Sequence, residues 1–65
     1  MELKYIPVYL RLLNKAHRRF PGKKLEHMPA CKTISETFEI VNNRIAWIQF
    51  HVEGDNSSHA EEMRI

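Results

Sequence analysis

The stretch "NNRIAWIQFHVEG", residues 42–54, decides the fold because its residues alternate in the manner of a β-strand. One set of alternate positions is entirely apolar: Ala46, Ile48, Phe50 and Val52. The other set mixes apolar and polar side chains: Ile45, Trp47, Gln49 and His51. A half-buried strand needs only one apolar face, so the second face with its tryptophan requires an explanation.

Residues 33–41, "TISETFEIV", precede this strand and are also rich in β-branched and aromatic residues, which predicts a β-hairpin. Asn42 and Asn43 tolerate the positive φ that tight hairpin turns require. A two-residue loop would pair Ile40 with Ile45, and a three-residue loop, residues 42–44, would pair Val41 with Ile45. The longer loop also pairs Phe38 with Ile48 and collects the apolar residues on one face, with only Glu36 misplaced. We therefore predict the three-residue loop.

Residues 7–20, "PVYLRLLNKAHRRF", predict an amphipathic helix that begins with Pro7 in its first turn and ends before Pro21 and Gly22. Its apolar residues fall within one arc: Val8, Tyr9, Leu12, Leu13, Ala16 and Phe20. We expect this arc to pack on the hairpin and to make three hairpin side chains nearly inaccessible: Phe38, Ile48 and Phe50.

Two segments have weaker patterns. In residues 21–32 we expect Leu25 and Met28 to contact the core from a single helical turn that Pro29 ends. In residues 55–65, Ser58 and Glu61 match a capping box, which favours a short C-terminal helix. Isolated helices of this length are marginal, so a frayed polar tail is an equal alternative.

These elements predict the α+β class: an N-terminal amphipathic helix packed on a β-hairpin, in the order αββ, or αββα with the C-terminal helix. Residues 1–54 form the single domain and residues 55–65 the tail or short helix. A chain of 65 residues buries only about 60% of its unfolded surface. Small domains therefore commonly depend on a partner subunit, and we expect a homodimer.

Three explanations compete for the second face of the hairpin. It is an association face for a second copy, or a platform on which Trp47 stacks a nucleic-acid base, or a surface covered by residues 21–32 or by the tail. The size of the chain favours association. The predicted association face consists of four residues: Val41, Ile45, Trp47 and Gln49.

Charge divides the chain into two halves. Residues 1–32 hold eight of the ten Lys and Arg residues but only two of the eight acidic residues. Six of these cations lie along the helix or just beyond it, and they are the predicted contacts for an anionic partner, either nucleic acid or another protein: Arg11, Lys15, Arg18, Arg19, Lys23 and Lys24. No helix-turn-helix, zinc-finger or RNA-recognition pattern accompanies them, so any nucleic-acid binding should have little sequence specificity.

Catalytic and metal-binding patterns are missing from the sequence. His27 and Cys31 have i, i+4 spacing, but Pro29 lies between them and no closed set of four zinc ligands exists. No nucleophile motif surrounds Cys31, and two glycines cannot build a glycine-rich phosphate loop. We therefore expect no enzymatic activity, no cofactor, no bound metal and no small-molecule substrate.

The remaining expectations concern location. The single cysteine suits a reducing compartment, and the first residues lack a signal-peptide pattern. A basic amphipathic helix is typical of membrane-surface binding. The apolar arc of this helix is expected to pack on the hairpin, however, so we expect no membrane contact. The sequence thus predicts a cytoplasmic accessory or regulatory protein that acts by protein–protein interaction, with a small nucleic-acid-binding accessory factor as the alternative.

Overall fold

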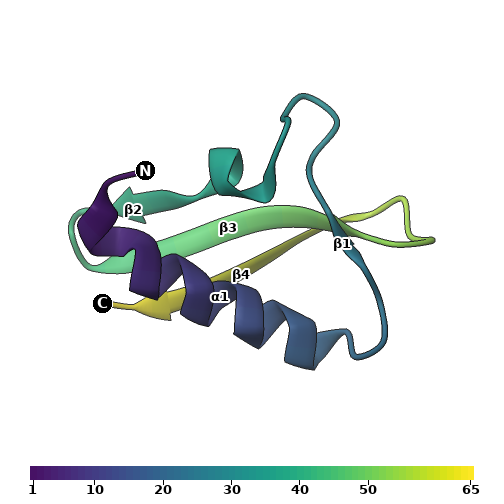
Figure 1. Cartoon of the computed structure of the whole chain (residues 1–65), viewed down its shortest axis with the longest axis horizontal. Helices are drawn as coiled ribbons and strands as arrows, with labels where there is room; N and C mark the ends of the chain where they lie inside the picture. Colours follow the sequence, from purple (N-terminus) through teal and green to yellow (C-terminus); the bar gives the residue numbers. More distant parts are fainter.

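An N-terminal helix covers one face of a four-stranded antiparallel sheet in the computed structural model, which describes residues 1–65 (Figure 1). The elements follow one another along the chain: a 3₁₀ turn at Leu3–Tyr5, α1 at Ile6–Arg19, β1 at Leu25–Glu26, a 3₁₀ turn at Ile34–Thr37, β2 at Glu39–Val41, β3 at Ile45–Val52 and β4 at Ser58–Arg64. The predicted helix is confirmed, with Pro7 in its first turn. The protein is therefore of the α+β class.

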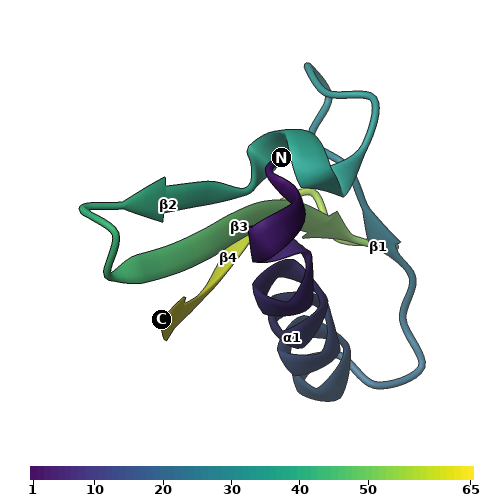
Figure 2. The same ribbon diagram turned by 60° about the vertical axis from the view of Figure 1, so that its left-hand side comes forward.

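Strand β3 is the centre of the sheet, since every other strand pairs with it (Figure 2). Strand β4 follows one edge of β3 along nearly its whole length, from the pair Ile45–Arg64 to the pair His51–Ser58. The two short strands share the other edge, with β2 at the start of β3 and β1 at its end.

The β2–β3 connection confirms the three-residue loop, because Val41 pairs with Ile45. Asn42 and Asn43 have φ values of 52° and 56°, in the left-handed region that asparagine tolerates better than most residues. The Arg44 N–H donates to the Val41 carbonyl at 3.0 Å. Turn chemistry and apolar segregation together therefore set the register.

The strand expected over residues 33–41 is confirmed only for Glu39–Val41 and is wrong for residues 33–38. Ile34–Thr37 forms a 3₁₀ turn, so Phe38 lies just before β2 and does not pair with Ile48. The Thr37 hydroxyl takes the place of a neighbouring strand at this point: it accepts the Gln49 N–H at 3.2 Å and also lies within bonding distance of the Gln49 carbonyl. One side chain thus supplies hydrogen-bond partners for the backbone groups of Gln49, which lies in the stretch of β3 between β2 and β1.

Residues 58–64 form β4, so the predicted short C-terminal helix is wrong and the segment is no frayed tail. Pairing with the free edge of β3 outweighs the local helical preference of these residues, because β propensity depends strongly on context. Alternate residues of β4 face the helix, because they lie opposite the core positions of β3: His59, Glu61 and Met63.

Residues 25–26 form β1, so the predicted helical turn in residues 21–32 is also wrong. Leu25 pairs with Val52 and is buried, which confirms only its expected contact with the core. The Glu53 N–H extends this pairing by donating to the Lys24 carbonyl at 2.9 Å. Backbone hydrogen bonds to the end of β3 thus replace those that a helical turn would make.

The core lies between α1 and the inner face of β3, and it contains seven buried apolar residues: Leu12, Ala16, Leu25, Ala46, Ile48, Phe50 and Val52. Phe20 meets Phe50 edge to face, with ring centroids 6.0 Å apart. Tyr9 meets Phe38 in the same way at 5.6 Å. Phe38 is half-buried, so the expectation that it is nearly inaccessible is wrong, whereas it is confirmed for Ile48 and Phe50.

Changing Phe50→Ala should lower the free energy of unfolding by about 3–5 kcal/mol, because it removes a large, fully buried ring from a small core. Leu10→Ala is the matched control: Leu10 is exposed on the same molecule, and its truncation should cost well under 1 kcal/mol. Urea denaturation followed by circular dichroism measures both changes. Equal stability of the Phe50 variant and the wild type would contradict the position of the core.

Candidate interaction surfaces

The four predicted association residues lie on the face of the sheet that α1 does not cover. Along β3 the core positions are buried, whereas Ile45 is 37% exposed and Trp47 and Gln49 are half-buried. Val41 is 41% exposed and lies opposite Ile45 on the neighbouring strand. The strand alternation therefore brings all four to one open surface.

Neighbouring strands add charged residues to this surface. Trp47 lies between Glu39 of β2 and Glu62 of β4, and its Nε1–H donates to the Glu39 carboxylate at 3.1 Å. Ile45 lies opposite Arg64 of β4. We define the outer sheet face as eight residues: Glu39, Val41, Ile45, Trp47, Gln49, Ala60, Glu62 and Arg64.

The hypothesis that the tail folds over Trp47 is wrong, because β4 lies beside β3 in the sheet. Residues 21–32 reach the far end of the same side of the sheet, where the Ser58 hydroxyl lies 3.9 Å from the sulfur of Met28. Trp47 remains partly exposed.

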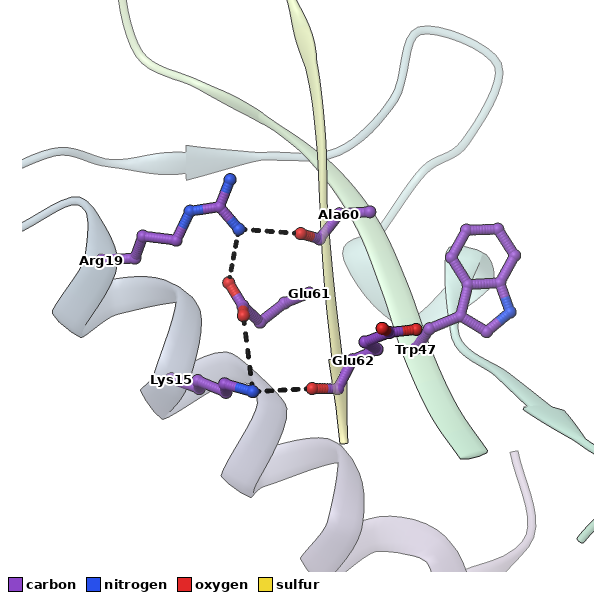
Figure 3. A pocket seen from close by; sticks show the side chains of 6 residues that line it. All are labelled: Lys15, Arg19, Trp47, Ala60, Glu61 and Glu62. Carbon is purple, nitrogen blue, oxygen red and sulfur yellow. Dashed lines mark hydrogen bonds and ion pairs between the residues drawn. The ribbon is translucent and has the colours of Figure 1, made fainter. Parts of the chain in front are cut away.

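The basic residues of α1 do not act as one group. Glu61 is opposite Ile48 on the helix side of the sheet and is only 8% exposed. Its carboxylate contacts the Arg19 guanidinium at 2.8 Å and the Lys15 ammonium at 3.6 Å (Figure 3). Two of the six predicted partner contacts are thus occupied within the protein.

The same two cations also bind the open edge of β4. Lys15 donates to the Glu62 carbonyl at 2.8 Å, and Arg19 donates to the Ala60 carbonyl at 2.9 Å (Figure 3). An unpaired edge strand presents such groups to other chains, and charged side chains are a common means of protecting it. Lys15 and Arg19 therefore join α1 to β4 and occupy the edge at which another strand could add.

The other four predicted contacts remain available to a partner. They are exposed and make no ion pair with a carboxylate of the chain: Arg11, Arg18, Lys23 and Lys24. Helix α1 contains no acidic residue at all. The basic face of α1, defined as Arg11 and Arg18 with Lys4 before them, therefore presents positive charge to solvent.

Two titratable groups outside these surfaces, Asp55 and Tyr9, have a shifted pKa. The backbone N–H of Ser57 holds the pKa of Asp55 below its ordinary value, and a hydrogen bond to His59 lowers it further. Burial raises the pKa of Tyr9.

No three His, Cys, Asp or Glu side chains gather where they could hold a metal ion. No helix has both the length and the apolar character needed to cross a bilayer.

The chain matches no known protein-family model, no curated protein and no solved structure.

Removing both cations from Glu61, as Lys15→Met with Arg19→Met, should lower the free energy of unfolding by about 1–3 kcal/mol, because a buried carboxylate then has no partner. Methionine keeps the apolar stems of both side chains. Glu61→Gln should cost less, because the two cations are each about half exposed and stay hydrated. Urea denaturation of both variants tests this asymmetry, and an equal or larger loss for Glu61→Gln would contradict it.

Proposed function

We propose that the protein is a small cytoplasmic accessory protein that pairs with a second copy through the outer sheet face. It presents the basic face of α1 to an anionic partner. The observation that carries the first part is the presence of Val41, Ile45 and Trp47 together on a sheet face without a covering layer.

The size of the molecule supports a second copy as the occupant of that face. Only seven apolar residues are buried, and the accessible surface of the chain is 4759 Å². A standard interface buries about 800 Å² on each partner, which is about a sixth of this surface. Stacking two sheets face to face would give Trp47 a second packed layer, as in β-sandwiches.

Trp47→Ala should convert the dimer to a monomer, because a large aromatic residue at the centre of an interface contributes about 2 kcal/mol or more. Light scattering at micromolar concentration measures the mass, and the wild type should have the mass of two chains. His17→Ala, on the exposed side of α1, is the control and should leave the mass unchanged. A wild-type mass of one chain would refute self-association.

The alternative function is nucleic-acid binding with little sequence specificity, and the four unpaired cations favour it. Four phosphate contacts predict that log K falls with log salt at a slope of about −3 to −4. Arg11→Gln with Arg18→Gln should reduce that slope by about two and leave stability unchanged, because exposed charges contribute little to folding. A gel-shift titration at several salt concentrations measures the slope, and the absence of any shift at low salt would exclude this alternative.

A further inference from the structure

Helix α1 exposes apolar side chains that the core does not use. Leu3 is 82% exposed, Ile6 39% and Leu10 51%. They are separated by three and four residues through the 3₁₀ turn and the start of α1, so they form one stripe along its surface. We call these three residues the apolar stripe.

Positive charge lies on the same open side of α1, about 100° around the helix from the apolar stripe. Lys4, Arg11 and Arg18 follow one another at seven-residue intervals, and the first two are the chain neighbours of Leu3 and Leu10. Lys4 pairs with Glu2 at 3.5 Å on the surface. The open side of α1 thus combines exposed apolar side chains with Arg11 and Arg18, which make no ion pair with a carboxylate of the chain.

We propose that this side of α1 binds an anionic membrane surface, and the inference rests on the anionic partner of the proposed function. A surface-bound amphipathic helix places apolar side chains at the boundary between headgroups and acyl chains. Its cations remain at the level of the anionic headgroups. The apolar stripe and the basic face of α1 supply these two components on two lines of one helix, about 100° apart.

The geometry of the fold allows this contact. The sheet lies on one side of α1 only, and the other side of the helix is open along its length (Figures 1 and 2). A helix of 14 residues is about 21 Å long, so it can lie flat on a bilayer while the outer sheet face points away. Membrane contact and self-association therefore use different surfaces.

Other occupants fit this side of α1 less well. A second copy packed here would bring like charges together, since α1 carries four basic residues and no acidic one. Nucleic acid would bind the cations but leave the apolar stripe in water. The expectation of no membrane contact rested on the apolar arc of the helix, which the core does occupy, but Leu3, Ile6 and Leu10 lie outside that arc.

Sedimentation with phosphatidylcholine vesicles, with or without about one third phosphatidylserine, tests the proposal. The full chain should bind the anionic vesicles much more strongly than the neutral ones. Arg11→Gln with Arg18→Gln should weaken binding about 25-fold, at about fivefold for each charge. Leu3→Gln with Leu10→Gln should weaken it at least tenfold.

Matched controls distinguish vesicle binding by the surface of α1 from vesicle binding by positive charge elsewhere on the protein. Lys23→Gln with Lys24→Gln removes two exposed cations beyond the end of α1 and should weaken vesicle binding far less than the helix pair. Circular dichroism should show that the Leu3 and Leu10 variant is folded, because both residues are exposed. A folded variant of this pair that binds anionic vesicles as well as the wild type would overturn the proposal.

A parallel titration with a short nucleic acid distinguishes the remaining outcomes. If the wild type binds nucleic acid but no vesicles, and the Leu3 and Leu10 variant binds it equally well, the membrane proposal fails and the anionic partner survives. If the wild type binds neither, the membrane proposal and the nucleic-acid alternative both fail, and an acidic protein is the anionic partner that the proposed function retains. Vesicle binding that is lost in the leucine variant while nucleic-acid binding is unaffected would support the membrane surface.

Discussion

The pairing of β4 with β3 is the interaction on which the rest of the structure depends. Its register sets Glu61 opposite Ile48, on the side of the sheet that faces α1. In that position one buried carboxylate contacts both Lys15 and Arg19, which lie one turn apart on the helix. The same pairing leaves one edge of β4 open, and the two cations bind its carbonyl groups. Helix orientation, edge protection and the charge left for partners all follow from this register.

The elements with a clear period could be predicted from the sequence. The period of two in residues 45–52 identifies the central strand and its buried face, and the 3.6-residue period in residues 7–20 identifies the helix. Strand β4 could not be predicted in this way, because Ala60, Glu61 and Met63 are good helix formers and Ser58 begins a local capping pattern. Its strand conformation depends on pairing with the free edge of β3, and local propensity gives no information about that tertiary contact. The one available signal was the alternation of His59, Glu61 and Met63, with a charged residue at the position that becomes buried.

The candidate surfaces show the same division between local and tertiary information. Alternation along the hairpin was enough to place Val41, Ile45 and Trp47 on one face. Helical spacing grouped the cations but could not show that Lys15 and Arg19 meet a carboxylate more than forty residues later in the chain. Nor could it show that Leu10, at the border of the apolar arc, stays in solvent. A partner surface is what remains after the fold has used its own side chains, so its residues become known only with the tertiary contacts.

The two proposed surfaces lie on opposite sides of a two-layer molecule, and this arrangement restricts how they act together. Two copies stacked through their outer sheet faces would form four layers, in the order helix, sheet, sheet and helix. The basic faces of the two α1 helices would then point in opposite directions. A flat bilayer could contact only one of them, so dimerisation would add no avidity on a single membrane, because both sites cannot be engaged at once. The free helix could instead contact a second surface, and the dimer would join two anionic surfaces across the thickness of two sheets and two helices.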